Sequence, residues 1–371
     1  MHIEKLGLIG FKNYEDIDLD FSVKINCFVG PNGSGKTNLL DAIHYLSMTR
    51  SAFNLVDTQN ILFGQNLFSI KGTLFKEGRR HEVLCAVSQG QKKIMRVDGN
   101  EHEKLSDHIG LFPVVLIAPD DTDIIRGPGE IRRKFFDMIL SQLDRDYLQK
   151  LIRYNHFLKQ RNTLLKQFSQ GQAFEQDLLA PYNRELIVLG NELFGKRRDF
   201  MKEFLDTFHA NYSWLSEEKE EVDIRYRSDN EIPDFESAFN NALSRDLALE
   251  RTTIGIHRDD YKFLIRDSPL KKFGSQGQQK TFLIALKLTN FQVIREHLEL
   301  VPILLLDDIF DKLDSHRIAR LMQKVAENDF GQIFITDARE ERTRSVLKEL
   351  TLNAAFYTID NGHVAPVENH V

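Results

Sequence analysis

The first third of the chain alternates apolar and polar residues in the way that half-buried strands do. This pattern predicts one strand over residues 3–8 and a second over 17–21, in which aspartates at every other position face water. Residues 25–29 form a short apolar run, which is typical of a buried strand. A glycine-rich segment comes next, and apolar residues at helical spacing then predict a helix over 38–45. The N-terminal part therefore contains a strand, a glycine-rich loop and a helix in that order.

Three further strands are predicted between residues 67 and 98. They cover 68–75, 82–87 and 92–97. The breaks at Glu77-Gly78 and at Gln89-Gly90-Gln91 have the composition of hairpin turns. Another apolar run, 114–117, precedes Pro119 and predicts one more buried strand.

The apolar period changes at about Ile131 and becomes helical. Large apolar residues recur every seven positions on both sides of a break at 170–172, at Leu151, Leu158 and Leu165 before it and at Leu179, Leu186, Leu193 and Phe200 after it, with Tyr147, Tyr154 and Phe168 between. Two long helices joined by a short turn would pack as an antiparallel pair. The repeats are too few for a long coiled coil, so an ordinary helical lobe is the plainer interpretation.

The last third alternates predicted strands and helices. After strands at 223–227 and 262–266, the pattern predicts a helix at 275–296, a strand at 303–306, a helix at 316–327, a strand at 332–336, a helix at 340–350 and a strand at 355–359. This rhythm indicates a parallel sheet with helices on its faces. The fold class is therefore α/β, with a helical lobe inserted between two halves of one domain. We expect the boundaries to be 1–130, 131–250 and 251–371.

The glycine-rich loop carries a phosphate-binding pattern. Gly30-Pro31-Asn32-Gly33-Ser34-Gly35-Lys36-Thr37 matches GxxxxGK[ST] in full, and it lies between a predicted strand and a predicted helix. Glycines allow backbone N–H groups to surround phosphate oxygens, and the helix N-terminus adds partial positive charge. Lys36 can reach the β- and γ-phosphates of ATP, and Thr37 can bind Mg²⁺. A glycine turn that binds nothing is the alternative, which the flanking strand and helix disfavour.

Two carboxylates end the apolar strand at 303–306. A buried charge needs a partner, and a bound cation is a natural one for Asp307 and Asp308. We expect Asp307 to help hold Mg²⁺, and Asp308 to orient or deprotonate the attacking water. The alternative is that one of them caps the next helix, which suits one aspartate better than two.

A second helix start completes a familiar order of motifs. Ser275 is a plausible N-cap for the helix that begins with Ser275-Gln276-Gly277-Gln278, and alone it would be read as no more. A phosphate loop, a Ser-x-Gly-Gln helix start and a double-carboxylate strand follow one another here as they do in ABC-type ATPases, and the chain resembles that superfamily. The resemblance implies that Ser275, Gly277 and Gln278 form a signature motif that touches the γ-phosphate held by another subunit. It also implies that Asp311-Lys312-Leu313-Asp314 is a D-loop, in which Asp314 lies at the dimer seam.

Four further segments resemble the RecF family within this superfamily. They are Phe11-Lys12-Asn13-Tyr14, the Ser-Gln-Gly-Gln-Gln-Lys form of the signature at 275–280, Gly255-Ile256-His257-Arg258-Asp259-Asp260, and Pro119-Asp120-Asp121 followed by Arg132-Arg133-Lys134-Phe135-Phe136-Asp137. Asp308, where many relatives have glutamate, also fits. The resemblance extends from residue 1 to about residue 360.

The resemblance implies an ABC/SMC-type ATPase head with a short helical arm. It implies that ATP and Mg²⁺ are bound, that ATP drives head-to-head homodimerisation, and that the protein binds gapped duplex DNA or single-strand/double-strand junctions. It further implies cooperation with RecR and RecO in loading recombinase during DNA repair, replication restart and the SOS response. Weak, DNA-stimulated hydrolysis would reset the dimer.

Three positions depart from the pattern of the superfamily. Asp337 stands where many ABC proteins place a switch histidine, and no glutamine for a Q-loop is identifiable near Pro119. Lys12 stands in place of the more usual arginine near the nucleotide, and lysine lacks the bidentate phosphate contact that arginine makes.

Composition adds limits rather than a function. The net charge is −6, so a DNA-binding surface must concentrate its basic residues locally. Cys27 and Cys85 form no CxxC pair, which disfavours a zinc site or a disulfide framework. No apolar run approaches a membrane span and no secretion signal is visible, so we expect a cytoplasmic protein without a membrane partner.

Basic clusters are the candidates for DNA contact, although most such clusters are merely solvated. They occur at Arg79-Arg80, Lys92-Lys93, Arg132-Arg133-Lys134, Lys196-Arg197-Arg198 and Lys271-Lys272. We favour Lys92-Lys93 and Arg132-Arg133-Lys134. Because no aromatic run accompanies them, the expected contact is with phosphates rather than bases.

Two other functions stay open on the sequence alone. One is a different SMC-like ATPase head, active in chromosome organisation or phage defence, and long coiled-coil arms would favour it. The other is a scaffold that binds ATP without turning it over, which intact Lys36, Asp307 and Asp308 disfavour. A GTPase is disfavoured because no N-K-x-D segment appears.

Overall fold

Two compact units make up the chain in the computed structural model, which describes residues 1–54, 56–170, 175–216, 220–312, 318, 320, 321, 323, 324 and 330–367. The first unit combines Met1–Asp121 with Leu286–Val371, and the second is the continuous stretch Thr122–Ala285. These bounds differ from the expected ones, because residues 251–285 group with the helical stretch. The cause is that β10 (Asp260–Ile265) pairs along its whole length with β9 (Val222–Arg227). The assignment of functional segments to 1–130, 131–250 and 251–371 stays a prediction.

A six-stranded sheet lies at the centre of the first unit, in the order β15-β14-β3-β13-β12-β8. Its strands are β3 (Ile25–Val29), β8 (Val114–Ile117), β12 (Ile303–Leu306), β13 (Ile333–Asp337), β14 (Ala354–Asp360) and β15 (His363–Pro366). All neighbours are parallel except β14 and β15. The prediction that both ends of the chain build one mostly parallel sheet is confirmed. Since β3, β13 and β12 are parallel neighbours, the segments that follow them leave the same edge of the sheet.

A second, antiparallel sheet completes this unit, in the order β2-β1-β4-β5-β6-β7. Its strands are β1 (His2–Phe11), β2 (Tyr14–Asp20), β4 (Leu67–Lys76), β5 (Arg79–Ser88), β6 (Ile94–Val97) and β7 (Asn100–Glu101). The helix α1 (Lys36–Met48) packs against β4 and β5 of this sheet and against β8 and β13 of the parallel one. Gly72 permits this approach, because a Cβ atom there would lie 2.5 Å from the side chain of Leu46. The helix that follows the predicted phosphate loop is thus held in place by both sheets.

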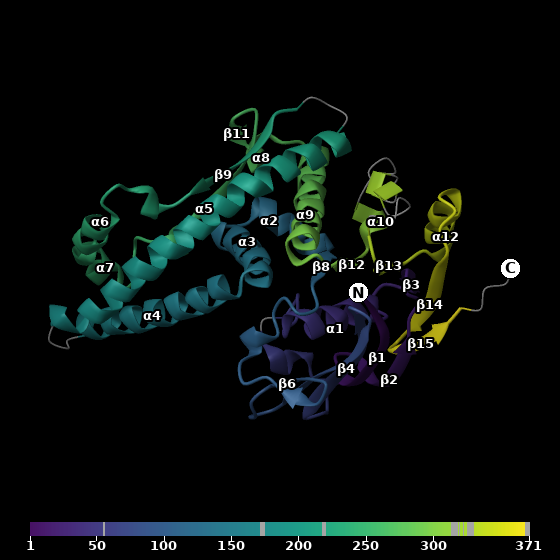
Figure 1. The fold of residues 1–371 in the computed structure, drawn as a ribbon. Helices are drawn as coiled ribbons and strands as arrows, with labels where there is room; N and C mark the ends of the chain where they lie inside the picture. The colour runs from purple at the N-terminus through teal and green to yellow at the C-terminus, as the bar shows by residue number, and fades with distance from the viewer. Residues whose placement is uncertain are drawn as a thin grey trace. The chain divides into compact units, whose positions relative to one another are not determined.

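The second unit is mainly helical (Figure 1). Its helices are α2 (Thr122–Arg126), α3 (Gly129–Leu143), α4 (Arg145–Ser169), α5 (Ala180–Ser216), α6 (Phe235–Asn241), α7 (Leu243–Leu249), α8 (Leu270–Phe273) and the first part of α9 (Gln276–Leu298), which continues into the first unit. The predicted long pair is confirmed as α4 and α5, which lie side by side. A small sheet, in the order β11-β10-β9, accompanies them, with β11 at Ser268–Pro269.

The remaining described elements are short. They are α10 (Ile309–Lys312), α12 (Glu340–Glu349) and the 3₁₀ helices Asp57–Asn60, Leu105–Asp107, Pro119–Asp121, Gln176–Leu178, Asp229–Glu231 and Ile256–Arg258. Most of the helix predicted over 316–327 lies outside the described residues. Among the residues that are described, no helix is long and apolar enough to cross a membrane.

Candidate functional site

The predicted phosphate loop joins the end of β3 to the start of α1. Gly30 and Gly35 both adopt positive φ angles, of 153° and 116°. A Cβ atom at Gly30 would lie 2.1 Å from the carbonyl oxygen of Ile359, and one at Gly35 would lie 2.4 Å from the Asn13 amide. These positions therefore require glycine because the neighbouring chain packs directly against the loop. That packing fixes the backbone of the loop before any ligand binds.

The ammonium group of Lys36 caps the loop from inside. Its Nζ donates hydrogen bonds to the carbonyl oxygens of Gly30 and Pro31, both at 2.8 Å. Burial lowers the pKa of Lys36, and the nearby carboxylates of Asp308 and Asp307 act in the opposite direction. A lysine in this environment gains from the approach of additional negative charge, such as that of a phosphate.

Thr37 and Asp307 meet at the edge of the sheet. The Thr37 hydroxyl donates to the two carboxylate oxygens of Asp307, at 2.8 Å to Oδ1 and 3.1 Å to Oδ2. Octahedral Mg²⁺ binds oxygen at 2.0–2.1 Å, so two adjacent ligand atoms lie about 2.9 Å apart. The separation of Thr37 Oγ1 and Asp307 Oδ1 therefore fits two adjacent ligands of one Mg²⁺. Such an ion usually takes its remaining ligands from phosphate and water.

Thr336 lies on β13, between β3 and β12, and it contacts both Asp307 and Asp308. Its hydroxyl donates to Asp307 Oδ1 at 2.7 Å and accepts a hydrogen bond from the backbone N–H of Asp308 at 2.8 Å. Burial raises the pKa of Asp307 and the charge of Asp308 adds to this, while the hydroxyls of Thr336 and Thr37 act against it. Asp308 itself adopts φ of 47°, an unusual backbone conformation for a non-glycine residue. Thr336 was not predicted as a site residue, and its only sequence signal is a polar residue closing an apolar strand.

These groups line one cavity of about 260 Å³. Of the predicted site residues it contains Asn32, Gly33, Gly35, Lys36, Thr37, Asp307 and Asp308, to which the structure adds Asn38 and Thr336. The cavity is smaller than the ~300–1,000 Å³ typical of sites that enclose a whole small molecule. It suits the phosphate end of a nucleotide and a metal ion.

The turn between β1 and β2 supports the loop from outside. Tyr14 donates its hydroxyl hydrogen to the carbonyl of Gly35 at 2.9 Å, and the Asn13 amide donates to the carbonyl of Ser34 at 3.0 Å. Lys12 is oriented differently, because its ammonium lies 2.6 Å from the fully buried carboxylate of Asp41 on α1. Asp41 also accepts hydrogen bonds from Ser51 and Ala52. Contact between Lys12 and a nucleotide stays a prediction, and it would need Lys12 to leave this ion pair.

Asp337, at the expected switch position, has a local structural role. Its carboxylate accepts hydrogen bonds from the backbone N–H of Arg339, from the Thr343 hydroxyl at 2.6 Å and from the Arg342 guanidinium. All three donors lie at or just before the start of α12, so Asp337 fixes the N-terminal end of that helix.

The predicted signature motif lies in the second unit. Ser275 Oγ accepts from the N–H of Gln278 at 3.2 Å, and Gln278 Oε1 accepts from the N–H of Ser275 at 2.6 Å. This reciprocal pair is a capping box, which stabilises the start of α9. Gly277 follows in the first turn of that helix, and its carbonyl accepts from Thr281 at 3.0 Å. Asp314, the predicted D-loop residue, lies outside the described residues.

The chain matches the RecF/RecN/SMC N terminal domain family over residues 2–355. It is 45% identical to the DNA replication and repair protein RecF of Cytophaga hutchinsonii, covering 98% of this chain and 96% of that protein. It is 44% identical to the same-named protein of Flavobacterium johnsoniae, covering 94% and 97%. The chain belongs to the RecF family.

Solved structures agree with this assignment. The recombination mediator protein RecF with ATP, in the RecFOR pathway, superposes with a TM-score of 0.89 at 26% identity, covering 99% of this chain and 98% of that one. A Smc head bound to the C-winged helix domain of ScpA shares the fold with a TM-score of 0.57 at 16% identity, covering 100% and 98%. The predicted ABC/SMC-type head is thus confirmed for this RecF-family chain.

Residues of two motifs that carried the RecF resemblance join Arg197 in a partly buried set of ion pairs in the second unit. Arg197 donates to Asp259 at 2.7 Å and to both carboxylate oxygens of Asp137 at 2.8 and 2.9 Å. Arg132 pairs through two nitrogens with Asp260, at 2.8 and 3.2 Å. These residues hold α3, α5 and the start of β10 together, so their role in the fold is structural.

This network corrects one candidate for DNA contact. The Arg132 side chain is only 8% exposed and is already paired, so it is not available to phosphates. Lys93 is similarly engaged, at 2.6 Å from Asp57 and 12% exposed. Of the favoured clusters, Lys92 and Lys134 keep exposed side chains, and Lys134 pairs with Glu130 at 2.7 Å. The sequence could not separate buried from solvated cations, because the partners lie far away along the chain.

Proposed function

We propose that this RecF-family protein is an ATP-driven switch that binds DNA as a dimer and resets itself by slow hydrolysis. The observation that carries the proposal is the meeting of Thr37, Asp307 and Lys36 around one small cavity. That arrangement supplies a cation for phosphate, two adjacent oxygen ligands for Mg²⁺ and a backbone loop shaped for anions.

The roles of the residues follow from their contacts. ATP with Mg²⁺ would supply the transferable γ-phosphoryl group. Lys36 would exchange its two carbonyl acceptors for phosphate oxygens, and the loop N–H groups would donate to the same oxygens. Asp307 and Thr37 would hold the metal ion, with Asp307 oriented by Thr336. Asp308, which lines the same cavity, would orient the attacking water or accept its proton.

Dimerisation completes the site in this proposal. Ser275, Gly277 and Gln278 of a second copy would contact the γ-phosphate, and Asp314 would lie at the seam. ATP would then bind the dimer better than the monomer, and only such differential affinity allows a ligand to drive association. Hydrolysis removes the shared group, so the dimer would separate.

The cellular role follows from the family. The relatives are DNA replication and repair proteins, and a structurally similar RecF is placed in the RecFOR pathway. We infer that the ATP-bound dimer binds gapped duplexes or single-strand/double-strand junctions. Cooperation with RecR and RecO in loading recombinase, in repair, replication restart and the SOS response, belongs to the same proposal.

The molar mass of the protein in solution, with and without nucleotide, tests whether ATP produces the dimer. We expect a monomer without nucleotide and a dimer with ATP and Mg²⁺, measured by light scattering or sedimentation. Lys36→Ala should abolish the dimer by removing nucleotide binding. Ser275→Arg should abolish it while nucleotide binding persists, because only the partner's pocket is blocked. A dimer that forms without nucleotide, or that survives Ser275→Arg, contradicts the proposed sandwich.

The rate of ATP hydrolysis distinguishes a switch from a scaffold that binds ATP without hydrolysing it. ATP hydrolysis should be slow and should rise when DNA with a gap or junction is added. Asp308→Asn should keep the ATP-induced dimer but reduce hydrolysis by roughly 10²–10⁴-fold, the usual contribution of a general base. A wild-type protein that forms the dimer but hydrolyses no ATP under either condition would be a binding scaffold instead.

A further inference from the structure

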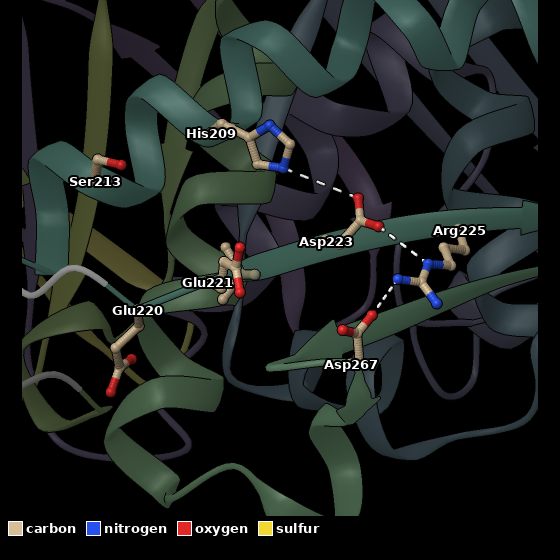
Figure 2. A pocket seen from close by; sticks show the side chains of 8 residues that line it. His209, Ser213, Glu220, Glu221, Asp223, Arg225 and Asp267 are labelled. Carbon is tan, nitrogen blue, oxygen red and sulfur yellow. Dashed lines mark hydrogen bonds and ion pairs between the residues drawn. The ribbon is translucent and has the colours of Figure 1, made fainter.

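A pocket of about 550 Å³ opens in the second unit beside the C-terminal end of α5. Figure 2 shows charged side chains of its wall joined in a row, from His209 to Asp223, to Arg225 and to Asp267. These side chains are between 38% and 75% exposed, so their pairing contributes little to stability. Glu220 also lines the pocket, but its side chain points away from this row (Figure 2).

Glu220 uses its two carboxylate oxygens to connect two helices. Oε2 accepts a hydrogen bond from the Tyr212 hydroxyl at 2.8 Å, and Oε1 accepts one from the Gln278 amide nitrogen at 2.5 Å. Tyr212 is 1% exposed and lies in the last turns of α5, while Gln278 lies in the first turn of α9. The aromatic rings of Tyr212 and Phe282 lie 6.2 Å apart and make a second, apolar contact between the same helices. Glu220 therefore joins an anchored residue to the signature motif.

The carboxylate also decides how the Gln278 amide is oriented. An ionised carboxylate can only accept hydrogen bonds, so the NH₂ group of Gln278 must face Glu220. The amide oxygen must then face the backbone N–H of Ser275, as its 2.6 Å contact shows. The reverse orientation would place the amide NH₂ against the Ser275 N–H and would break the capping box. Glu220 thus selects the orientation that holds Ser275.

In this arrangement the Ser275 hydroxyl keeps its hydrogen for another acceptor. Its oxygen accepts from the Gln278 N–H at 3.2 Å, and it donates to no atom in the part of the chain that the structure describes. Ser275 is also exposed. A hydroxyl that accepts one hydrogen bond and keeps its hydrogen for a further acceptor suits contact with an anionic oxygen.

We propose that Glu220 is a positioning residue for the signature motif, holding Ser275 so that its hydroxyl reaches the γ-phosphate bound by a second copy. The inference rests on the proposed function, because it gives Glu220 a role in the ATP-dependent dimer. Glu220 acts through Gln278 and touches neither nucleotide nor metal ion itself.

Three variants separate this role from a general effect on folding. Glu220→Ala removes both acceptors. Glu220→Gln keeps one acceptor oxygen for Gln278, and its new NH₂ group can donate to the Tyr212 hydroxyl, which can accept as well as donate. Glu221→Ala removes the same charge from the neighbouring exposed residue of the same pocket wall, and it is the matched control.

The measurements are the dimer dissociation constant with ATP and Mg²⁺, the affinity of the dilute monomer for ATP, and the thermal unfolding temperature. We expect Glu220→Ala to raise the dimer dissociation constant about tenfold or more, since hydrogen bonds to charged groups contribute at this scale. The affinity of the monomer for ATP should stay within about twofold of the wild type, because the signature motif contacts the nucleotide of the other copy. A merely structural role of Glu220 would instead lower both ATP affinity and dimer association. Glu220→Gln should recover most of the association, and Glu221→Ala should match the wild type.

The outcomes are distinguishable from failure of the proposed function. If the wild type forms no dimer with ATP, the sandwich itself fails. If the wild type dimerises and Ser275→Arg does not, but Glu220→Ala associates as tightly as the wild type, only the role of Glu220 is overturned. The role of Glu220 is also overturned if Glu220→Ala lowers the unfolding temperature, the ATP affinity and the dimer association together and Glu220→Gln restores none of them. Glu220 would then have a structural role.

Discussion

One hydroxyl group, that of Thr336, connects the carboxylate of Asp307 to the backbone of Asp308 at the end of β12. It donates to Asp307 and accepts from the backbone of Asp308, so both of its hydrogen-bonding capacities are directed at the proposed catalytic strand end. Thr336 is fully buried, and its partner Asp307 is nearly so, which makes each of these bonds costly to lose. Thr336 would thus act on the proposed metal site through Asp307.

Removing the Thr336 hydroxyl should raise the Mg²⁺ concentration that ATP hydrolysis requires. Thr336→Val has nearly the same shape but cannot donate to Asp307, and groups that orient metal ligands are typically worth 10–100-fold in metal affinity or activity. We expect the Mg²⁺ concentration for half-maximal ATPase activity to rise about tenfold. Thr336→Ser, which keeps the hydroxyl, is the control and should stay near the wild type. If the Mg²⁺ dependence of the Thr336→Val variant is unchanged, Thr336 has no role in binding the metal ion.

The predictability of individual residues depended on how local their contacts are. The phosphate loop could be predicted because its eight residues are contiguous and their spacing is dictated by the ligand. The pair Asp307 and Asp308 was visible because it interrupts an apolar run. Thr336 and the Lys12–Asp41 ion pair were not predictable, since both depend on segments 29 positions apart in the chain that only the fold brings together.

At the scale of elements, the structure separates the two apolar series that the sequence showed along α4. Of the leucine series, Leu165 is fully buried, whereas Leu151 and Leu158 are only half-buried. The buried row contains Tyr147, Tyr154, Arg161 and Phe168, which also recur every seven residues. Apolar periodicity located the helix correctly but did not show that Arg161 belongs to its inner face, because a buried arginine carries no apolar signal.

Arg161 shows why that face tolerates a charge. The side chain is 1% exposed and donates to Asp246 at 2.6 Å, to Thr252 at 2.8 Å and to Asn183 at 2.7 Å. Its guanidinium also lies 4.9 Å from the ring centre of Phe239. One arginine thereby links α4 to α5, α6, α7 and the segment after α7.

Replacing Arg161 alone should destabilise the second unit strongly. Arg161→Met leaves the fully buried Asp246 unpaired, and breaking such a pair from one side costs about 3–5 kcal/mol. The double variant Arg161→Met, Asp246→Asn should cost less than the single arginine change, because no charge is left uncompensated. Urea unfolding followed by circular dichroism measures both. A double variant less stable than Arg161→Met would show that the ion pair is not the source of the loss.

A partly buried histidine, His257, joins α4 to the segment before β10. His257 Nδ1 lies 2.8 Å from the Tyr154 hydroxyl and Nε2 lies 3.0 Å from the carbonyl of Thr252. Burial, together with the nearby charges of Arg258 and Arg133, lowers the pKa of His257 to about 4, although the Thr252 hydrogen bond and Asp229 act in the opposite direction. The folded protein therefore holds this histidine neutral while the unfolded chain protonates it at about pH 6.5.

Stability should consequently fall as pH drops from about 6.5 towards 4. The depressed folded pKa means that the contribution is complete above the unfolded pKa and is lost as the solution is acidified through this window. At pH 5.5 the loss from this one group is roughly 1.3 kcal/mol relative to pH 7.5. His257→Gln should reduce the difference between the two pH values by that amount, whatever its effect at pH 7.5. If the wild type and His257→Gln lose the same stability between pH 7.5 and pH 5.5, His257 is protonated in the folded state at the lower pH.

At the scale of the whole molecule, the proposed dimer would combine residues of the first unit of one copy with residues of the second unit of the other copy. The phosphate loop, Asp307 and Asp308 belong to the first, whereas Ser275, Gly277 and Gln278 belong to the second. The mostly parallel sheet could be predicted because strand and helix alternate along the chain. The grouping of residues 251–285 with the helical unit could not, because it follows from the pairing of β10 with β9 rather than from any local pattern.

If nucleotide drives association, association must strengthen nucleotide binding by the same factor. Apparent ATP affinity should therefore rise with protein concentration. Couplings of this kind are typically about 5–150-fold, so a titration with a slowly hydrolysed ATP analogue at protein concentrations spanning a hundredfold range should reveal it. Ser275→Arg should bind with the affinity of the dilute wild type at every concentration. Should the wild type show one affinity throughout, even where scattering detects the dimer, nucleotide and dimer would be independent, and ATP could not act as the switch.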